Sequence, residues 1–94
     1  MSNVCTCTVY RPGEAPVEKH LDFEGVRAEI GGYAEPIYLN DGETVLIVRE
    51  DALYFPDLPK NERATKIALQ RSKVLIDRDG LRGTAVLAPE AILG

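Results

Sequence analysis

Residues 31–48 constrain the fold of this chain more than any other part of its sequence. The stretch begins with two glycines, which favour the left-handed backbone conformation that ends a helix. A strand-like alternation follows over residues 33–39, and Asn40-Asp41-Gly42 is a strong hairpin signal before an apolar run over 44–48. The stretch therefore predicts the end of a helix, a strand, a tight turn and a second strand.

Residues 44–48 are apolar at nearly every position, which is typical of a strand buried on both faces. We expect this strand to lie inside the sheet, with one of its two rows of side chains packed against Val26 and Ile30 of a covering helix. Pro36 has no N–H to donate to a neighbouring strand. Residues 33–39 are therefore expected near an edge of the sheet.

The N-terminal third of the chain predicts two more strands and the covering helix. Residues 4–10 alternate in a β-rich pattern, and residues 16–21 form a weaker pattern that predicts a short edge strand. His20 lies in that second segment, and we expect a solvated edge residue rather than a catalytic base. Asp22 is a good N-cap for a helix over residues 22–30, which places apolar side chains at helical spacing.

The C-terminal half is less regular. Residues 64–70 are compatible with either a strand or a helical turn, and Tyr54 and Phe55 are expected to anchor the loosely patterned region around the turn at 57–61. Residues 73–77 and 81–87 flank a turn and predict a second hairpin. Pro89 precedes a short apolar segment and predicts a terminal helical turn.

These elements predict a single α+β domain over residues 1–94, with an antiparallel or mixed sheet of about five strands and one main helix packed on one face. Ninety-four residues are enough for one modest core. No apolar run approaches the roughly 20 residues that span a bilayer. The first five residues also lack the layout of a signal peptide, so that a cytoplasmic protein without membrane contact is expected.

The cysteines and glycines favour structural roles over cofactor chemistry. Cys5 and Cys7 would lie about 6.5 to 7 Å apart on a strand, at the limit for a disulfide. Together with His20 they supply at most three zinc ligands, so we expect buried or half-buried thiols and no metal site. Gly31-Gly32 follows a predicted helix and lacks the rest of a phosphate-binding motif, and no cofactor is predicted.

The most functional-looking segment is basic. Residues 60–73 contain five basic residues and one acidic residue, although the whole chain has a net charge of −4. Pro59 could hold a turn that presents donors for a phosphate or carboxylate. The predicted ligand-binding residues are Asn61, Arg63, Lys66 and Tyr33. The alternative is that Asn61 satisfies local backbone groups while the basic residues form a solvated face.

Three motifs resemble a known family. They are Ile30-Gly31-Gly32-Tyr33-Ala34-Glu35, the hairpin Leu39-Asn40-Asp41-Gly42 with Val45-Leu46-Ile47-Val48, and Leu58-Pro59-Lys60-Asn61-Glu62-Arg63-Ala64-Thr65. Over about residues 17–87 the chain is similar to small phage and bacterial proteins grouped as domain of unknown function 3846. The resemblance implies a phage or mobile-element setting, and it implies no activity, cofactor or catalytic residue.

These observations favour a non-enzymatic accessory protein. It would bind a host protein or a second copy of itself through a sheet edge or through the surface of residues 54–66. The alternative is a protein that binds or sequesters a small, nucleotide-like anion. Duplex nucleic acid is disfavoured by the acidic total charge. An enzyme ranks last, because one histidine and no nucleophile–base pair leave little to build one.

Overall fold

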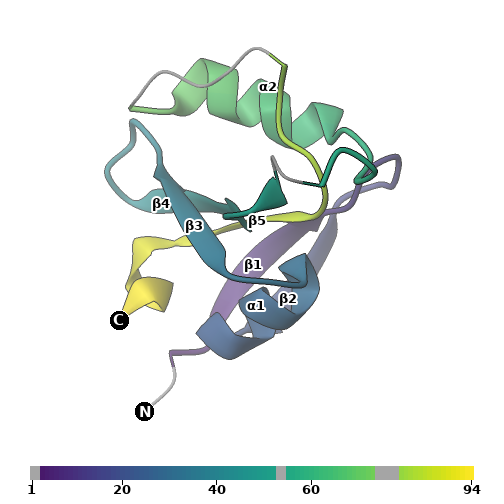
Figure 1. The fold of residues 1–94 in the computed structure, drawn as a ribbon. Helices are drawn as coiled ribbons and strands as arrows, with labels where there is room; N and C mark the ends of the chain where they lie inside the picture. Colours follow the sequence, from purple (N-terminus) through teal and green to yellow (C-terminus); the bar gives the residue numbers. More distant parts are fainter. Residues whose placement is uncertain (1–2, 53–54, 74–78) are drawn as a thin grey trace.

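The computed structural model describes residues 3–52, 55–73 and 79–94, and it has one five-stranded sheet with a helix on each face (Figure 1). The strands are β1 Cys5–Tyr10, β2 Val17–Leu21, β3 Ala34–Tyr38, β4 Thr44–Arg49 and β5 Ala85–Pro89. They lie in the order β2-β1-β5-β4-β3, and every neighbouring pair is antiparallel. The described helices are α1 Phe23–Ile30, α2 Glu62–Arg71 and the short 3₁₀ helix η2 Glu90–Leu93. The predicted α+β fold is confirmed.

Helix α1 begins and ends where the sequence predicts. Asp22 Oδ1 accepts a hydrogen bond of 2.7 Å from Gly25 N, which satisfies one of the free N–H groups of the first turn. The helix ends at Gly31, whose φ of 78° is left-handed and whose N–H donates to Arg27 O at 2.9 Å. Among the residues that the structure describes, apart from the two chain neighbours, none places an atom within 4 Å of a Cβ built on Gly31. The backbone angle alone therefore requires this glycine.

We expect Gly31→Val to lower the free energy of unfolding by about 1 to 2 kcal/mol, because a β-branched residue is strained in the left-handed region. Gly31→Asn should lose less, since asparagine tolerates that conformation. Urea unfolding of both variants measures the difference. Equal midpoints for the two variants would contradict a conformational origin.

Three charged side chains tie α1 to the β1–β2 end of the sheet. Glu29 accepts hydrogen bonds from Lys19 Nζ at 2.6 Å and from Arg11 Nη2 at 2.8 Å. The hydrogen bond from Lys19, together with the two positive charges, holds the pKa of the Glu29 carboxyl below its usual range. This contact helps to fix the helix over its face of the sheet.

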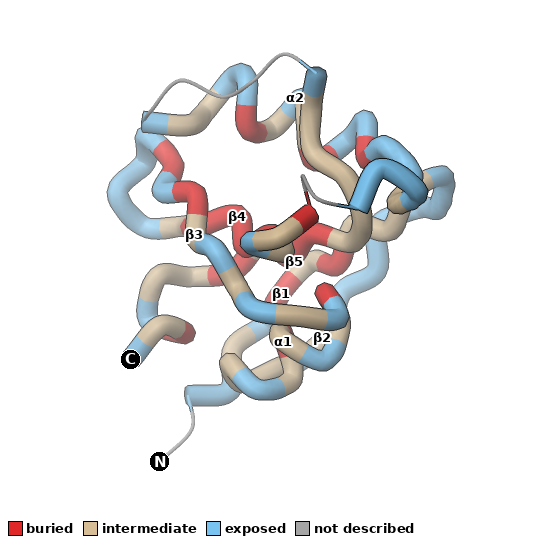
Figure 2. Tube along the Cα trace, viewed as in Figure 1, coloured by how far each residue is buried: buried red, intermediate tan, exposed pale blue. Residues whose placement is uncertain are grey.

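The four central residues of β4 are buried (Figure 2). Their side chains alternate between two hydrophobic cores, one on each face of the sheet. Val45 and Ile47 face α1 and belong to one core together with Val26 and Ile30. This contact was predicted from the sequence and is confirmed. It explains why a helix of only eight residues, weakened by Gly25, is stable here: its stability comes from packing rather than from propensity.

The second core lies on the opposite face, under α2. Leu46 and Val48 pack there with Ala64 and Ala68, which are buried at i and i+4 on one side of the helix. Their small side chains allow the helix to approach the sheet closely. Residues 64–70, which the sequence left open between strand and helix, are therefore helical, and the sheet is covered on both faces.

The two edges of the sheet are β2 and β3, as predicted. Leu39 N donates to Thr44 O and Glu50 N donates to Tyr33 O. Because hydrogen-bonded positions alternate along an antiparallel pair, these two bonds show which β3 residues direct their backbone groups toward β4. In this register Pro36 is paired with Ile47 at a position whose backbone groups point away from β4. A proline fits there because its missing N–H leaves no gap in the ladder.

Asp41 organises the β3–β4 hairpin. Its Oδ1 accepts from Glu43 N at 2.8 Å and from Thr44 N at 2.9 Å, and Thr44 Oγ1 donates to Oδ2 at 2.6 Å. Arg71, at the end of α2, forms an ion pair of 2.9 Å with Oδ2. These contacts hold the pKa of the Asp41 carboxyl well below its usual range, and the hydrogen bond from the Thr44 hydroxyl has the largest effect.

We expect acid to remove the contribution of Asp41 to stability. Because its folded-state pKa is lowered, the contribution is complete above the ordinary aspartate pKa of about 3.9 and is lost as the pH falls below it. Asp41→Asn should therefore have a lower Tm than the parent chain at pH 7, and this difference should shrink at pH 2 to 3. A difference in Tm that is constant between pH 7 and pH 2 would contradict this assignment.

The predicted second hairpin differs from the structure. Residues 74–78 lie outside the described residues, and the strand predicted over 81–87 is instead β5, Ala85–Pro89. The reason is that β5 is paired along both edges, with β1 and with β4. Leu81 is held by α2 instead, since its N–H donates to Thr65 Oγ1 at 2.8 Å. The terminal helical turn is confirmed as η2, with Pro89 directly before it.

Candidate functional site

Asn61 is a structural residue. Its side chain is buried, with 1% of the residue exposed, and Oδ1 accepts from Ala64 N as the N-cap of α2. Its Nδ2 donates to Tyr10 O at 2.8 Å and to Gly83 O at 2.9 Å. The amide is therefore fully used by the backbone, which is the alternative that the sequence left open. Both of its amide hydrogens are donated to backbone carbonyls, so neither is available to a ligand in this structure.

The structure does not bring the other predicted residues together around Asn61. Arg63 and Lys66 are exposed on α2, and Lys66 lines a groove along that helix. Tyr33 follows α1 and lines a separate depression with Arg27 and other residues of α1. Figure 1 shows α1 and α2 on opposite faces of the sheet. A single anion site bordered by this tyrosine is not formed.

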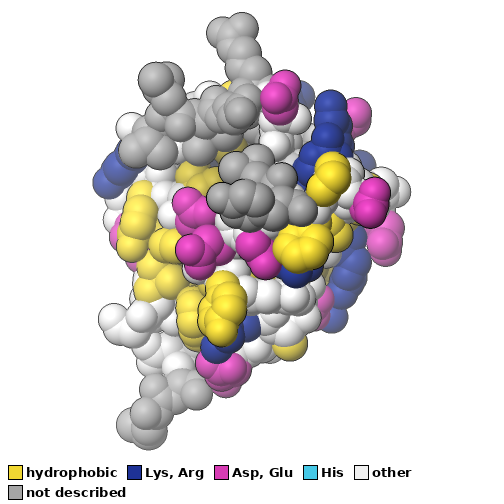
Figure 3. Space-filling view, in the orientation of Figure 1, with side chains coloured by type: hydrophobic (Ala, Val, Ile, Leu, Met, Phe, Trp, Pro, Cys, Tyr) yellow, Lys and Arg dark blue, Asp and Glu magenta, His cyan; other side chains and the backbone are white. Residues whose placement is uncertain are grey.

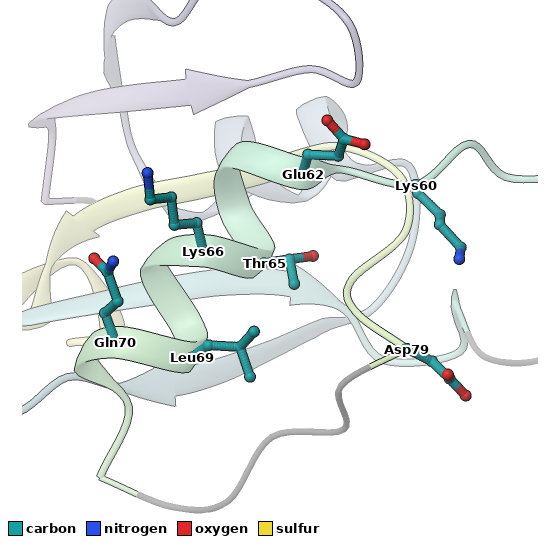
Figure 4. A pocket seen from close by; sticks show the side chains of 7 residues that line it. All are labelled: Lys60, Glu62, Thr65, Lys66, Leu69, Gln70 and Asp79. Atoms are coloured by element: carbon teal, nitrogen blue, oxygen red, sulfur yellow. The ribbon is translucent and has the colours of Figure 1, made fainter.

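The groove along α2 has a volume of about 500 Å³. It is lined by Lys60, Glu62, Thr65, Lys66, Leu69, Gln70 and Asp79 (Figure 4). The two lysines point in different directions in that view. The Thr65 hydroxyl donates to Asn61 O at 2.7 Å and accepts from Leu81 N. Two acidic residues balance the two lysines, so this groove has no excess of positive charge.

A second surface carries exposed aromatic rings, each stacked on an arginine. Tyr33 is 68% exposed, and the Arg27 Cζ lies 5.3 Å from the centre of its ring. Phe55 is 43% exposed, and the Arg49 Cζ lies 4.5 Å from the centre of its ring. We call these four residues the aromatic corner. Phe55 was expected to anchor a loop and instead remains substantially exposed; Tyr54 lies outside the described residues.

Arg49 connects the two halves of the aromatic corner. A Cβ on Gly32 would lie 2.8 Å from the Arg49 Nε, so the arginine side chain runs directly against the backbone next to Tyr33. The same Nε donates to Asp51 Oδ1 at 2.6 Å. The backbone of Gly32, the Asp51 carboxylate and the Phe55 ring all contact Arg49, so its side chain is positioned by contacts within the chain.

The sequence did not indicate the two arginines of the aromatic corner. Arg27 lies in a helix whose pattern points only to its buried face, and Arg49 lies at the end of an apolar strand. Of the four residues of the aromatic corner, Tyr33 was predicted to bind a ligand, and Phe55 lies within the 54–66 surface that was predicted as one of two routes of protein binding. The contacts that join Tyr33 to Arg27 and to Gly32–Arg49 depend on how α1 meets the sheet, and no local pattern encodes them.

The two cysteines lie on β1 and the histidine on β2, on the side of the sheet opposite β3. Both thiols are free, with Cys7 buried and Cys5 partly buried, as predicted. Burial, together with the neighbouring Cys5, raises the pKa of the Cys7 thiol and disfavours the reactive thiolate. His20 is exposed on edge strand β2, where its Nδ1 lies 3.2 Å from Thr6 Oγ1. It is the solvated edge residue that the sequence predicts.

Comparisons with protein-family models, curated proteins and solved structures give no match to this chain. The resemblance over residues 17–87 therefore stays a prediction. Within the described residues, no helix has the length and apolar character needed to cross a bilayer.

Proposed function

We propose that this chain is a non-enzymatic accessory protein that binds another protein chain through the aromatic corner. The observation that carries the proposal is the exposure of Tyr33 and Phe55, each stacked on an arginine, at one end of the sheet. Tyrosine, phenylalanine and arginine are enriched in protein interfaces, and tyrosine and arginine dominate their energetics.

The stacking also favours binding in energetic terms. A side chain that is already ordered loses less conformational entropy when a partner covers it. Arg49 is held by Gly32, Asp51 and Phe55, and Arg27 is held by Tyr33 and by Glu24 at 3.5 Å. The aromatic corner is thus partly preorganised, which supports a binding role over a merely solvated surface.

The proposed setting is the cytoplasm of a cell that carries a phage or another mobile element. The resemblance over residues 17–87 supports the mobile-element setting. The two free cysteines fit a reducing compartment, because free thiols persist where disulfides are kept reduced.

Photo-crosslinking tests protein binding at this surface. A photoreactive phenylalanine analogue placed at position 33 or 55 should crosslink a protein in the native cells. The matched controls are positions 4 and 69, where Val4 is 67% and Leu69 is 50% exposed. A crosslink to a second copy of the chain identifies self-association, and a crosslink to a different chain identifies a foreign partner. Equal crosslinking at all four positions would refute the proposal.

The second candidate is a binder of a small anion in the groove along α2, where Lys60 and Lys66 would be the cationic donors. A thermal-shift screen against nucleotides and inorganic phosphate tests it, because a ligand at 100 times its Kd stabilises the folded state by about 2.7 kcal/mol. A shift that disappears in Lys60→Ala and Lys66→Ala would favour this candidate. No shift across the panel would exclude it.

A further inference from the structure

We infer that two copies of this chain pair antiparallel along the outer edge of β2 and so extend the sheet from one copy into the other. The partner is a second copy because β2 is complementary to itself in one register. In that register residues 17, 18 and 19 lie opposite residues 21, 20 and 19 of the second copy, and the pair has twofold symmetry. This edge lies opposite β3, so the inference does not depend on the aromatic corner.

The outer edge of β2 has free backbone groups. The hydrogen bond from Glu90 N to Glu43 O shows which residues of β5 bond to β4, and the residues between them bond to β1. Because bonded positions alternate along each antiparallel pair, residues 17, 19 and 21 of β2 bond to β1, and Glu18 and His20 direct their N–H and C=O groups outward. In the part of the chain that the structure describes, β2 pairs with β1 alone. Glu18 and His20 therefore offer two donors and two acceptors to another strand.

The side chains of β2 select the register. When Glu18 lies opposite His20 of the second copy, the twofold axis generates this carboxylate–imidazole pair twice. The neighbouring registers that keep the outward backbone groups facing each other slide one copy by two residues. One of them places Glu18 opposite Glu18, and the other places Glu18 opposite Asp22. Like charges directly opposite each other are destabilising, so the first register is favoured.

The same register gives partners to exposed groups of β2. Glu18 is exposed and makes no ion pair among the described residues. The His20 Nδ1 lies 3.2 Å from Thr6 Oγ1. When the hydroxyl donates to Nδ1, Nε2 carries the ring hydrogen and can donate to the Glu18 carboxylate of the second copy. Val17 is 41% exposed and lies opposite Leu21 of the second copy, so pairing also buries apolar surface.

Lys19 is the residue of β2 that lies opposite itself in this register. A lysine on an edge strand usually discourages pairing. Here its Nζ lies 2.6 Å from Glu29 Oε1 on α1. Each lysine is thus compensated by a carboxylate and drawn toward the helix of its own copy, away from the lysine of the other copy.

The opposite edge of the sheet, β3, is less suited to pairing with a second copy. Pro36 has no N–H, and Lys73 N already donates to Tyr38 O at 3.0 Å. Figure 3 shows acidic side chains among hydrophobic ones on the face that contains β3, and a second copy would add charge of the same sign. Self-pairing is therefore assigned to β2.

Sedimentation velocity of the parent chain tests the pairing. Because a contact between two edge strands is small, we expect a monomer of 10.3 kDa at about 10 μM and a growing fraction of dimer toward about 1 mM. A monomer throughout this range of concentration would overturn the inference.

Charge reversal tests whether the dimer uses β2. Glu18→Lys and His20→Glu should each raise the Kd of the dimer about five- to thirtyfold, because each affects two symmetry-related pairs. The double variant Glu18→Lys/His20→Glu again places opposite charges together and should return the Kd close to that of the parent chain. The control Glu35→Lys makes the same change at an exposed position of the other edge strand and should change the Kd less than about twofold. A double variant weaker than both single variants, or equal effects of Glu35→Lys and Glu18→Lys, would contradict this contact.

Single cysteines identify the register. The background is Cys5→Ser/Cys7→Val, because the natural Cys7 thiol lies opposite Lys19 within the chain. Oxidation should link Lys19→Cys to its own copy, since opposed residues that are not hydrogen-bonded have Cα atoms about 4.5 Å apart. Glu18→Cys and His20→Cys should link poorly, because each lies diagonal to itself at about 7 to 8 Å. On a non-reducing gel, a stronger link at position 18 or 20 than at position 19 would overturn the register.

This inference and the proposed function can fail separately. If crosslinking from positions 33 and 55 fails while the parent chain dimerises and responds to Glu18→Lys, the aromatic corner falls and the β2 contact stands. If the chain stays monomeric but still crosslinks a different chain from those positions, the β2 contact falls and the proposed function stands. Far-UV circular dichroism spectra equal to that of the parent chain show that the variants are folded.

Discussion

Asn61→Ala is expected to lower the free energy of unfolding by about 3 to 5 kcal/mol. The substitution removes the N-cap of α2 and leaves the carbonyls of Tyr10 and Gly83, two partly buried residues, without their amide donor. Each lost hydrogen bond costs about 0.5 to 1.5 kcal/mol, or up to about 3 kcal/mol where water does not replace the donor, and the lost cap adds about 1 kcal/mol. Urea unfolding followed by far-UV circular dichroism measures the change.

Asn61→Asp separates the cap from the two donor contacts. The carboxylate has nearly the same shape and still accepts from Ala64 N, but it cannot donate to Tyr10 O or Gly83 O. We expect a loss comparable to that of Asn61→Ala at pH 7. The loss should become smaller as the pH falls, because the protonated acid regains one donor. A stability equal to that of the parent chain would show that the donor contacts contribute nothing.

Leu46→Ala and Ile47→Ala are each expected to destabilise the fold by about 2 to 5 kcal/mol, because both side chains are fully buried and leave a cavity. The two variants affect opposite faces of β4. Leu46 belongs to the core under α2 and Ile47 to the core under α1. Urea unfolding gives the size of each loss.

Native-state hydrogen exchange distinguishes the two cores. Leu46→Ala should lower the protection of backbone amides mainly in α2, and Ile47→Ala mainly in α1. Native-state exchange can show this because amides that exchange by local opening are distinguished from those that exchange only by global unfolding. The matched control is Leu69→Ala on the exposed side of α2, with an expected change within about 0.5 kcal/mol. Equal losses of protection in both helices for both variants would contradict the assignment of two separate cores.

Because Asn61 has a structural role, the candidate site lies elsewhere than the sequence predicts. The sequence predicts donors for an anion around Asn61, which follows Pro59 by two residues. The structure uses the most suitable of these donors to join α2, the end of β1 and the loop before β5. The exposed, preorganised surface lies instead beside Tyr33, at the other helix.

The elements with local signals were predictable from the sequence. Asp22 and Gly31 bound α1, Asp41 and Gly42 form the hairpin turn, and Pro36 occurs on an edge strand. Each of these depends on backbone angles or hydrogen bonds within a few residues, so a short stretch of sequence is enough to predict it.

The form of residues 64–70, the place of β5 and the aromatic corner depend on tertiary contacts. Residues 64–70 became a helix because two alanines pack against Leu46 and Val48, and β5 became the central strand because β1 and β4 both pair with it. The aromatic corner forms only where α1 meets the end of β4. These outcomes depend on contacts between residues far apart in the chain, whose energies no local pattern of residues contains.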